Sequence, residues 1–209
     1  MATSARPLLT RGGLRQAFFD LGAAACYLLF AFAHVRSFLT TPRASMLLIV
    51  VTESLFAVFF LVRKDADRTT DRPADWLAAF FGTLLPMLLR PSAALHDLPL
   101  AQLIQVIGTA GSVAGILSLN RSVSVVPSHR EVRTAGAYRL VRHPLYASYL
   151  VSNLGYVLSN QSPRNLLVLV ATTAFQLVRI QAEERLLQEF ADYREYRQRT
   201  RWRLIPFVF

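Results

Sequence analysis

Two groups of polar residues in the second half of the chain have the types and spacing that chemistry requires. The first is Arg142-His143-Pro144-Leu145-Tyr146. Pro144 disfavours helical backbone at His143 and suits the first turn of a following helix, so Arg142 and His143 should stand directly before a helix N-terminus. Free backbone N–H groups and a partial positive charge make such an end a seat for a carboxylate or phosphate. A basic membrane boundary that binds only lipid phosphate would use the same residues, and the block alone does not separate the two interpretations.

The second group begins with Arg179 and Glu183, which are four residues apart and could pair on one helix face. Glu184 then leads a helically spaced ladder that ends in Tyr193 and Tyr196. Adjacent carboxylates where an apolar segment ends are costly to bury without partners. Either both are solvated and balance nearby arginines, or at least one holds a cationic ligand group such as an amine. The arginines that follow could bind anionic lipid headgroups instead of substrate; they are Arg199, Arg201 and Arg203.

The elements that would position these groups are apolar helices. Of the 209 residues, 53% are hydrophobic and only 17% charged, and the charges are bunched between long apolar stretches. A helix needs about 20 residues to cross a bilayer. The apolar stretches cover 17–39, 44–62, 74–90, 98–119, 144–160 and 164–181. This pattern predicts an all-α membrane protein with five to six membrane helices, the last two either tilted crossings or a short helical hairpin. The last 25 residues are predicted to form an amphipathic helix.

Basic residues predict the orientation of these helices. With the N-terminus inside, 18 of the 23 arginines and lysines fall in the inside segments and 4 in the outside segments. Under the positive-inside rule, this bias predicts an integral, multi-pass protein with both termini in the cytoplasm. The polar segment 120–143 and the C-terminal helix then lie on one side and can build one site. We therefore expect a cytoplasmic arm (1–16), N-terminal membrane helices (17–119) and a cofactor-binding and catalytic region (120–209).

Several residues outside these two groups also bear on function. Arginines cap the apolar spans instead of lining one soluble face, so the basic excess does not indicate nucleic-acid binding. The four histidines lack metal-ligand spacing, and no metal is expected. Gly111 and Gly115 suit a close helix-packing face. Glu53 lies in the middle of a span, where an ionisable group is a functional candidate, although pairing with an arginine or hydroxyl inside the bundle is equally compatible.

From Ser128 to Pro206 the chain resembles the integral membrane methyltransferases that include isoprenylcysteine carboxyl methyltransferase and the phospholipid N-methyltransferases. Each block of the resemblance is short, but their order and spacing extend over some 80 residues. The matching residues are Ser128, His129, Thr134, Gly136, Tyr138, Arg142, His143, Pro144, Tyr146, Glu183, Glu184, Leu187, Phe190, Tyr193, Tyr196, Arg203 and Pro206.

The resemblance implies an S-adenosylmethionine site between the polar segment and the last helices, and S-adenosylhomocysteine as product. The residues it implies for the cofactor are His129, Gly136, Tyr138, Arg142, His143, Pro144, Tyr146, Glu183 and Glu184. By charge, Arg142 and His143 suit the methionine carboxylate, and Glu184 suits the amino group or the acceptor. Those expected to act in catalysis are Arg142, Glu184, Arg199 and Arg203, with a tail arginine closing the pocket. Candidates for the acceptor site are Glu53, Tyr193 and Tyr196.

One departure concerns Ser148, where the family often has glycine. The extra side chain puts the shape of the acceptor pocket in question more than the cofactor site. The acceptor itself is left open among an isoprenylcysteine-like carboxylate, a phospholipid amine and a small or lipophilic thiol. Membrane lipids are the other expected partner.

Two other functions compete with methyl transfer. Sterol reductases carry a similar Arg-His-Pro-x-Tyr block but use NADPH, are usually longer, and typically have Arg-Asp-Glu where this chain has Ala182-Glu183-Glu184. A non-enzymatic scaffold or transporter would use Glu53 and the glycine face as a packing seam or path. Such a protein would not need the spacing around Arg142. Length and the acidic pair favour methyl transfer.

Overall fold

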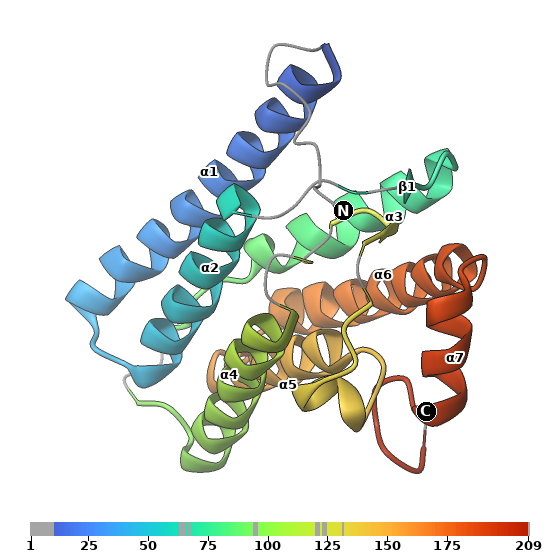
Figure 1. Ribbon diagram of the computed structural model, residues 1–209. Coiled ribbons are helices and arrows are strands. Elements are labelled where there is room, and N and C mark those ends of the chain that lie inside the picture. Colours follow the sequence, from blue (N-terminus) through green and yellow to red (C-terminus); the bar gives the residue numbers. More distant parts are fainter. Residues whose placement is uncertain are drawn as a thin grey trace.

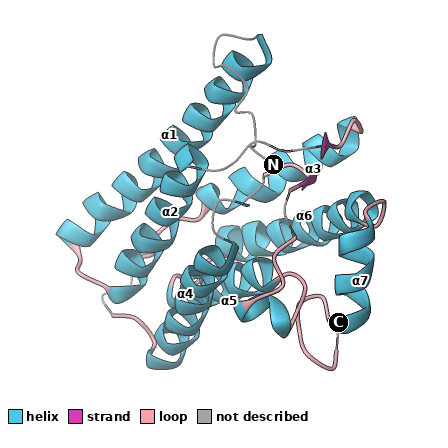
Figure 2. Ribbon diagram, in the orientation of Figure 1, coloured by secondary structure: helices cyan, strands magenta, loops and turns pink. Residues whose placement is uncertain are grey.

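The computed structural model describes residues 11–62, 66, 68–93, 96–119, 122, 125–130 and 132–208, with the side chains of the first helix described from Leu21 onward. Most of these residues are helical (Figures 1 and 2). The helices are α1 (Arg11–Thr40), α2 (Ala44–Val62), α3 (Pro73–Leu84) with the short 3-10 turn η1 (Leu85–Leu88), α4 (Pro99–Leu119), the 3-10 turn η3 (Gly136–Arg139), α5 (Pro144–Ser159), α6 (Pro163–Leu187) and α7 (Ala191–Arg199). Two short strands, β1 (Arg68–Thr69) and β2 (Ser128–His129), pair antiparallel.

The all-α prediction is confirmed, and four helices are long and apolar enough to cross a membrane. The corresponding segments are Leu21–Thr40, Ala44–Leu61, Pro99–Leu119 and Pro163–Leu187. The α3–η1 segment and α5 are shorter, so a total of five to six crossings remains a prediction. Large apolar side chains on the outer helix faces are more than half exposed, among them Leu29, Leu103 and Leu167. A surface of this kind suits contact with lipid.

Proline sets the start of several helices. It occupies the first helical turn of α3, α5 and α6, where its missing N–H costs no intrahelical bond. At α6 the Ser162 hydroxyl also accepts a bond from the backbone N–H of Asn165, at 3.1 Å. Local sequence alone therefore fixes the N-terminal ends of these helices.

Helices α4 and α5 lie side by side in close contact, as Figure 1 shows. A Cβ built on Gly108 would stand 2.2 Å from the backbone N of Ser152, and one on Gly155 would stand 2.4 Å from the backbone N of Gln105. Gly111 faces Ser148 in the same seam, because its Cβ would lie 2.4 Å from the Ser148 Oγ. The missing side chain at Gly111 thus leaves room for the Ser148 hydroxyl.

Substitution of Gly108 tests this helix contact. We expect Gly108→Ala to separate α4 from α5 and to lower the free energy of unfolding by about 1–3 kcal/mol, the usual range for overpacking. The contact is with backbone, which cannot move aside as a flexible side chain can. Gly22→Ala in α1 is the matched control, since nothing lies within 4 Å of its added Cβ. Denaturation of the detergent-purified variants by sodium dodecyl sulfate, followed by circular dichroism, measures the difference; equal midpoints would contradict the close packing.

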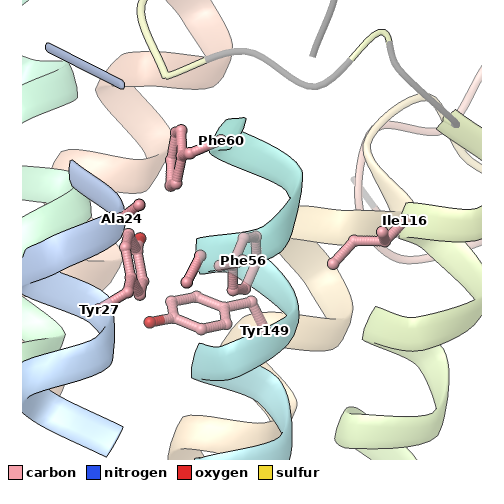
Figure 3. Packing of buried hydrophobic residues seen from close by; sticks show 7 residues of the cluster. Ala24, Tyr27, Phe56, Phe60, Ile116 and Tyr149 are labelled. Atoms are coloured by element: carbon pink, nitrogen blue, oxygen red, sulfur yellow. The ribbon is translucent and has the colours of Figure 1, made fainter. Parts of the chain in front are cut away.

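The main aromatic cluster lies between α1, α2 and α5 (Figure 3). Tyr27 stacks on Phe56 and Phe60, with ring centroids 5.6 and 5.4 Å apart. The Tyr149 ring meets Phe56 edge-on at 5.2 Å. Ile116 contributes to the cluster from α4 and is fully buried. This cluster brings aromatic side chains of the first two helices next to α5, which carries the Arg142–Tyr146 block at its start.

The C-terminal part differs from the prediction. Helix α6 continues to Leu187, six residues beyond the predicted end of its apolar stretch, so Glu183 and Glu184 lie in its last turns. The predicted 25-residue amphipathic helix is wrong in length: α7 has nine residues, because extended backbone at Phe190 and Thr200 ends it on both sides. In Figure 1, α7 (red) runs across the end of α6 and leads into a non-helical tail.

Candidate functional site

Arg142 and His143 occupy the position before α5 that Pro144 predicts. His143 has φ −127° and ψ 57°, outside the helical range, and Pro144 is at the helix start. The first helical bond runs from the Ala147 N–H to the His143 carbonyl, at 3.1 Å. The N–H groups of Leu145 and Tyr146 therefore have no partner within the helix and face its N-terminal end.

Glu184 is the centre of a buried ion cluster that joins three separate segments. Its Oε1 accepts from Arg142 Nε at 2.7 Å and lies 3.2 Å from His143 Nε2. Its Oε2 accepts from Arg203 Nε at 3.0 Å. The Glu184 side chain is 2% exposed and that of Arg142 5% exposed. Charges that are buried this deeply are tolerated only when they are paired with one another.

The tail is bound to the same two residues by its backbone. We call residues Thr200–Arg203 the tail strap. The Arg142 N–H donates to the Trp202 carbonyl at 2.8 Å, and the His143 N–H donates to the Arg203 carbonyl at 2.9 Å. The Arg142 guanidinium also donates to the carbonyls of Thr200 and Arg201, at 3.0 and 2.6 Å. The orientation of Arg142 is therefore determined jointly by α6 and the tail strap.

Glu183 has a different environment from Glu184. It accepts a bond from the Tyr146 hydroxyl at 2.9 Å instead of pairing with Arg179. Arg179 lies over the Tyr146 ring, 5.2 Å from its centroid, and donates to the Val125 carbonyl at 2.7 Å. Gly82 leaves space for Arg179, because a Cβ there would stand 2.7 Å from the arginine Cδ. The predicted Arg179–Glu183 pair is replaced by contacts that both residues make with Tyr146.

Three tyrosines form the floor beside this cluster. Tyr138, Tyr193 and Tyr196 are buried and pack with Leu187. The Tyr196 hydroxyl donates to the Tyr138 carbonyl at 2.7 Å, which fixes the turn η3 to α7. Burial raises the pKa of all three tyrosines, so their phenols stay protonated at neutral pH. The Tyr193 hydroxyl is buried and has no hydrogen-bond partner within the described part of the chain, which marks it as a group available to a ligand.

A single cavity connects these residues with the aromatic cluster of the membrane helices. The cavity is partly open to the surface of the protein. One part of its wall is polar and comprises Arg130, Arg133, Tyr138, Arg142, His143, Tyr146, Arg179, Glu183, Tyr193 and Tyr196. Another part is aromatic and comprises Tyr27, Phe56, Phe60 and Tyr149. The polar and apolar surfaces thus belong to one space.

Most predicted site residues surround this cavity, but not all of them line it. Tyr138, Arg142, His143, Tyr146, Glu183, Tyr193 and Tyr196 do. Glu184 and Arg203 lie behind the wall and act on it through Arg142 and His143. Pro144 shapes the helix start. Arg199 points away from the cavity, with its side chain 74% exposed and paired with Glu195.

The remaining candidates have structural contacts of their own. His129 stacks on Phe190 with ring centroids 3.6 Å apart and lies 3.4 Å from Asp192. Gly136 has φ +61°, a conformation that favours glycine, and a Cβ there would stand 2.4 Å from the Ser118 Oγ. Glu53 is fully buried and accepts from the Tyr149 hydroxyl at 3.1 Å.

Sequence reasoning missed several residues of the cavity wall. Tyr149 is three residues after Tyr146 and so lies on the same face of α5, a spacing that could have identified it. Gln176 precedes Arg179 and Glu183 at helical spacing on α6 and shares their cavity face. Arg130 and Arg133 were noted only as part of the polar segment.

Substitution of two neighbouring tyrosines separates binding from folding. We expect Tyr193→Phe to weaken ligand binding with little loss of stability, because its hydroxyl faces the cavity without a partner. We expect Tyr196→Phe to cost about 1–3 kcal/mol of stability, since it leaves the buried Tyr138 carbonyl unpaired. Thermal unfolding and S-adenosylhomocysteine titration of both variants measure the two effects; the reverse assignment would contradict these roles.

The fold and the site together define a helical, multi-pass membrane protein with a ligand cavity between the start of α5 and the end of α6. Residues 100–189 match the model of the isoprenylcysteine carboxyl methyltransferase (ICMT) family. This match covers less than half of the chain, agrees with the resemblance predicted from the motifs and supports an ICMT-family membrane protein. The matched segment runs from α4 to the end of α6, with Arg142 and Glu184 inside it and α7 and the tail strap outside. No curated protein matches the chain significantly.

Proposed function

We propose that this protein transfers the methyl group of S-adenosylmethionine to a lipophilic or small acceptor at the membrane. The observation that carries the proposal is the single cavity with both a charged and an aromatic wall. The charged wall suits a charged cofactor, and the aromatic wall suits an apolar acceptor. Methyl transfer requires both molecules side by side in one cavity.

The polar wall suits the parts of the cofactor. S-adenosylmethionine has a carboxylate, an ammonium group and a sulfonium, and it supplies the electrophilic methyl when bound. The unpaired N–H groups at the start of α5 would bind the carboxylate, together with a cavity arginine such as Arg133. Glu183 is the carboxylate of the cavity wall and suits a cationic group. Tyr193 offers a neutral hydroxyl that none of the described groups uses.

The ion cluster around Glu184 has a supporting role in this proposal. Arg142 and His143 bind Glu184, and the tail strap holds Arg142 by two further bonds. Glu184 and Arg203 would therefore act by fixing the cavity wall. Of the two tail arginines expected to close the pocket, Arg203 is the one that reaches the cluster.

The aromatic wall suits the acceptor. Tyr27, Phe56 and Phe60 come from α1 and α2, which are membrane-spanning by length and composition. An in-line displacement requires little of the protein beyond alignment of the acceptor and exclusion of water, and an aromatic enclosure supplies both. The candidate acceptors are an isoprenylcysteine-like carboxylate, a phospholipid amine and a thiol. We propose that the polar wall of the cavity and both termini lie on the cytoplasmic side, as the arginine distribution predicts.

Labelled methyl transfer tests the proposal. Purified protein in vesicles would be incubated with S-adenosylmethionine labelled in its methyl group and with one acceptor of each class. We expect label in one lipophilic product, and less of it with Tyr193→Phe at low cofactor concentration. Reduction of a sterol double bond with NADPH, without methyl transfer, would establish the competing reductase function instead.

A further inference from the structure

The tail that follows the strap exposes a group of apolar side chains. Ile205 is 55%, Phe207 85% and Val208 73% exposed, and Leu140 beside the strap is 69% exposed. Trp202 contacts Phe207, with ring centroids 5.5 Å apart. We call Leu140, Trp202, Ile205, Phe207 and Val208 the tail patch. Apolar side chains gathered in this way mark an interaction surface.

Positive charge surrounds the tail patch. Residues 194–208 contain five arginines and a single acidic residue, Glu195. Glu195 is already paired with Arg199. The side chains of Arg197 and Arg201 are exposed. Aromatic and aliphatic residues beside arginines have the composition of segments that bind the interface of anionic membranes.

The bonds of the strap place the tail patch near the end of α6, a helix that is long and apolar enough to span a membrane, because Arg203 pairs with Glu184 in the last turn of that helix. Trp202 and Arg203 are hydrogen-bonded to Arg142 and His143, which directly precede α5. Helix α7 runs across the end of α6 and does not continue its direction, and the C mark in Figure 1 lies at the far end of α7. The protein's own membrane is therefore the surface within reach of the tail patch.

We propose that the tail patch inserts into the interface of the protein's own membrane, with the neighbouring arginines on anionic lipid headgroups. The insertion anchors the strap, and through it the orientation of Arg142 and the Arg203–Glu184 pair. Because the tail patch is separate from the cavity wall, this inference does not depend on the methyl acceptor or the cofactor.

Fluorescence of Trp202 tests the insertion directly. The chain has two tryptophans, so Trp76→Phe leaves Trp202 as the only reporter. This variant would be placed in phosphatidylcholine vesicles with increasing phosphatidylglycerol, with and without bromine on the upper acyl chains. We expect brominated lipid to lower the Trp202 emission about twofold, since interfacial segments lie some 5–10 Å into the headgroup–acyl boundary. The quenching should increase with the fraction of phosphatidylglycerol.

Three further variants in the Trp76→Phe background make the test specific. Phe207→Ser combined with Val208→Ser should abolish the quenching, while Gln198→Ser, an exposed change on α7, should retain it. Arg197→Gln combined with Arg201→Gln should remove the dependence on phosphatidylglycerol. Absence of quenching in helical, folded protein would overturn the proposal, as would quenching that the serine pair leaves unchanged. Quenching independent of phosphatidylglycerol would overturn the role of the arginines. None of these outcomes depends on methyl transfer.

Discussion

Glu184→Gln is expected to lower the free energy of unfolding by about 3–5 kcal/mol, the usual cost of breaking a buried ion pair from one side. Glutamine keeps the shape of the side chain but removes the charge that holds Arg142, His143 and Arg203. Arg142 is 5% exposed at its side chain, so water cannot replace the lost partner. The same change should weaken S-adenosylmethionine binding at least tenfold, about 1.4 kcal/mol, because the wall formed by Arg142 and His143 loses its support.

Glu189→Gln is the matched control for this change. Glu189 follows α6 by two residues and pairs with Arg68 at 2.8 Å, but both side chains are about half exposed. Exposed pairs contribute roughly 0–1 kcal/mol. Chemical denaturation and cofactor titration of the two variants should therefore differ clearly. If Glu184→Gln matched the control in both measurements, the cluster would have no organising role.

Glu53→Gln is expected to lower turnover about a hundredfold, within the range for loss of a general base, while cofactor affinity stays unchanged. Glu53 is fully buried on α2, and its Oε2 has no partner within the described residues. Its Oε1 accepts from Tyr149, which lines the aromatic wall of the cavity. Glutamine can still accept that bond but cannot take up a proton. The effect should appear with an amine or thiol acceptor, which releases a proton on methylation, and not with a carboxylate acceptor.

Two other variants define the role of Glu53. Tyr149→Phe should reduce turnover as well, because it disconnects Glu53 from the cavity wall. Thr52→Ala changes the neighbouring position of α2 without touching the pair and should have little effect on turnover. Initial rates at saturating cofactor, with titration of S-adenosylhomocysteine alongside, measure both quantities. Unchanged turnover in Glu53→Gln with every acceptor would leave Glu53 with a packing role only.

Local patterns were sufficient to predict most of the helices. The starts of α3, α5 and α6 follow from proline in the first turn, and hydrophobicity delimits α2 and α4. The end of α6 was missed, because Arg179, Glu183 and Glu184 have the composition of a segment outside the membrane. They remain helical because tertiary partners satisfy each of them: Val125 for Arg179, Tyr146 for Glu183 and Arg142 for Glu184.

The sequence predicted which residues belong to the site, but not which of them contact each other. Charge suggested a ligand carboxylate for Arg142 and an amino group for Glu184, yet the two residues bind each other across 42 positions of sequence. Such pairing depends on the relative position of α5 and α6, which no local pattern specifies. Backbone bonds from the tail strap are equally independent of side-chain type. Ser148 is a similar case, because the space for its side chain is provided by Gly111 on another helix.

Calorimetric titration of the detergent-purified protein with S-adenosylhomocysteine, beside NADPH, tests the proposed cofactor most directly. We predict micromolar binding of S-adenosylhomocysteine, about −8 kcal/mol, that Tyr193→Phe and Arg142→Ala both weaken, and no binding of NADPH. Folded protein that binds NADPH and not S-adenosylhomocysteine would contradict the methyltransferase account.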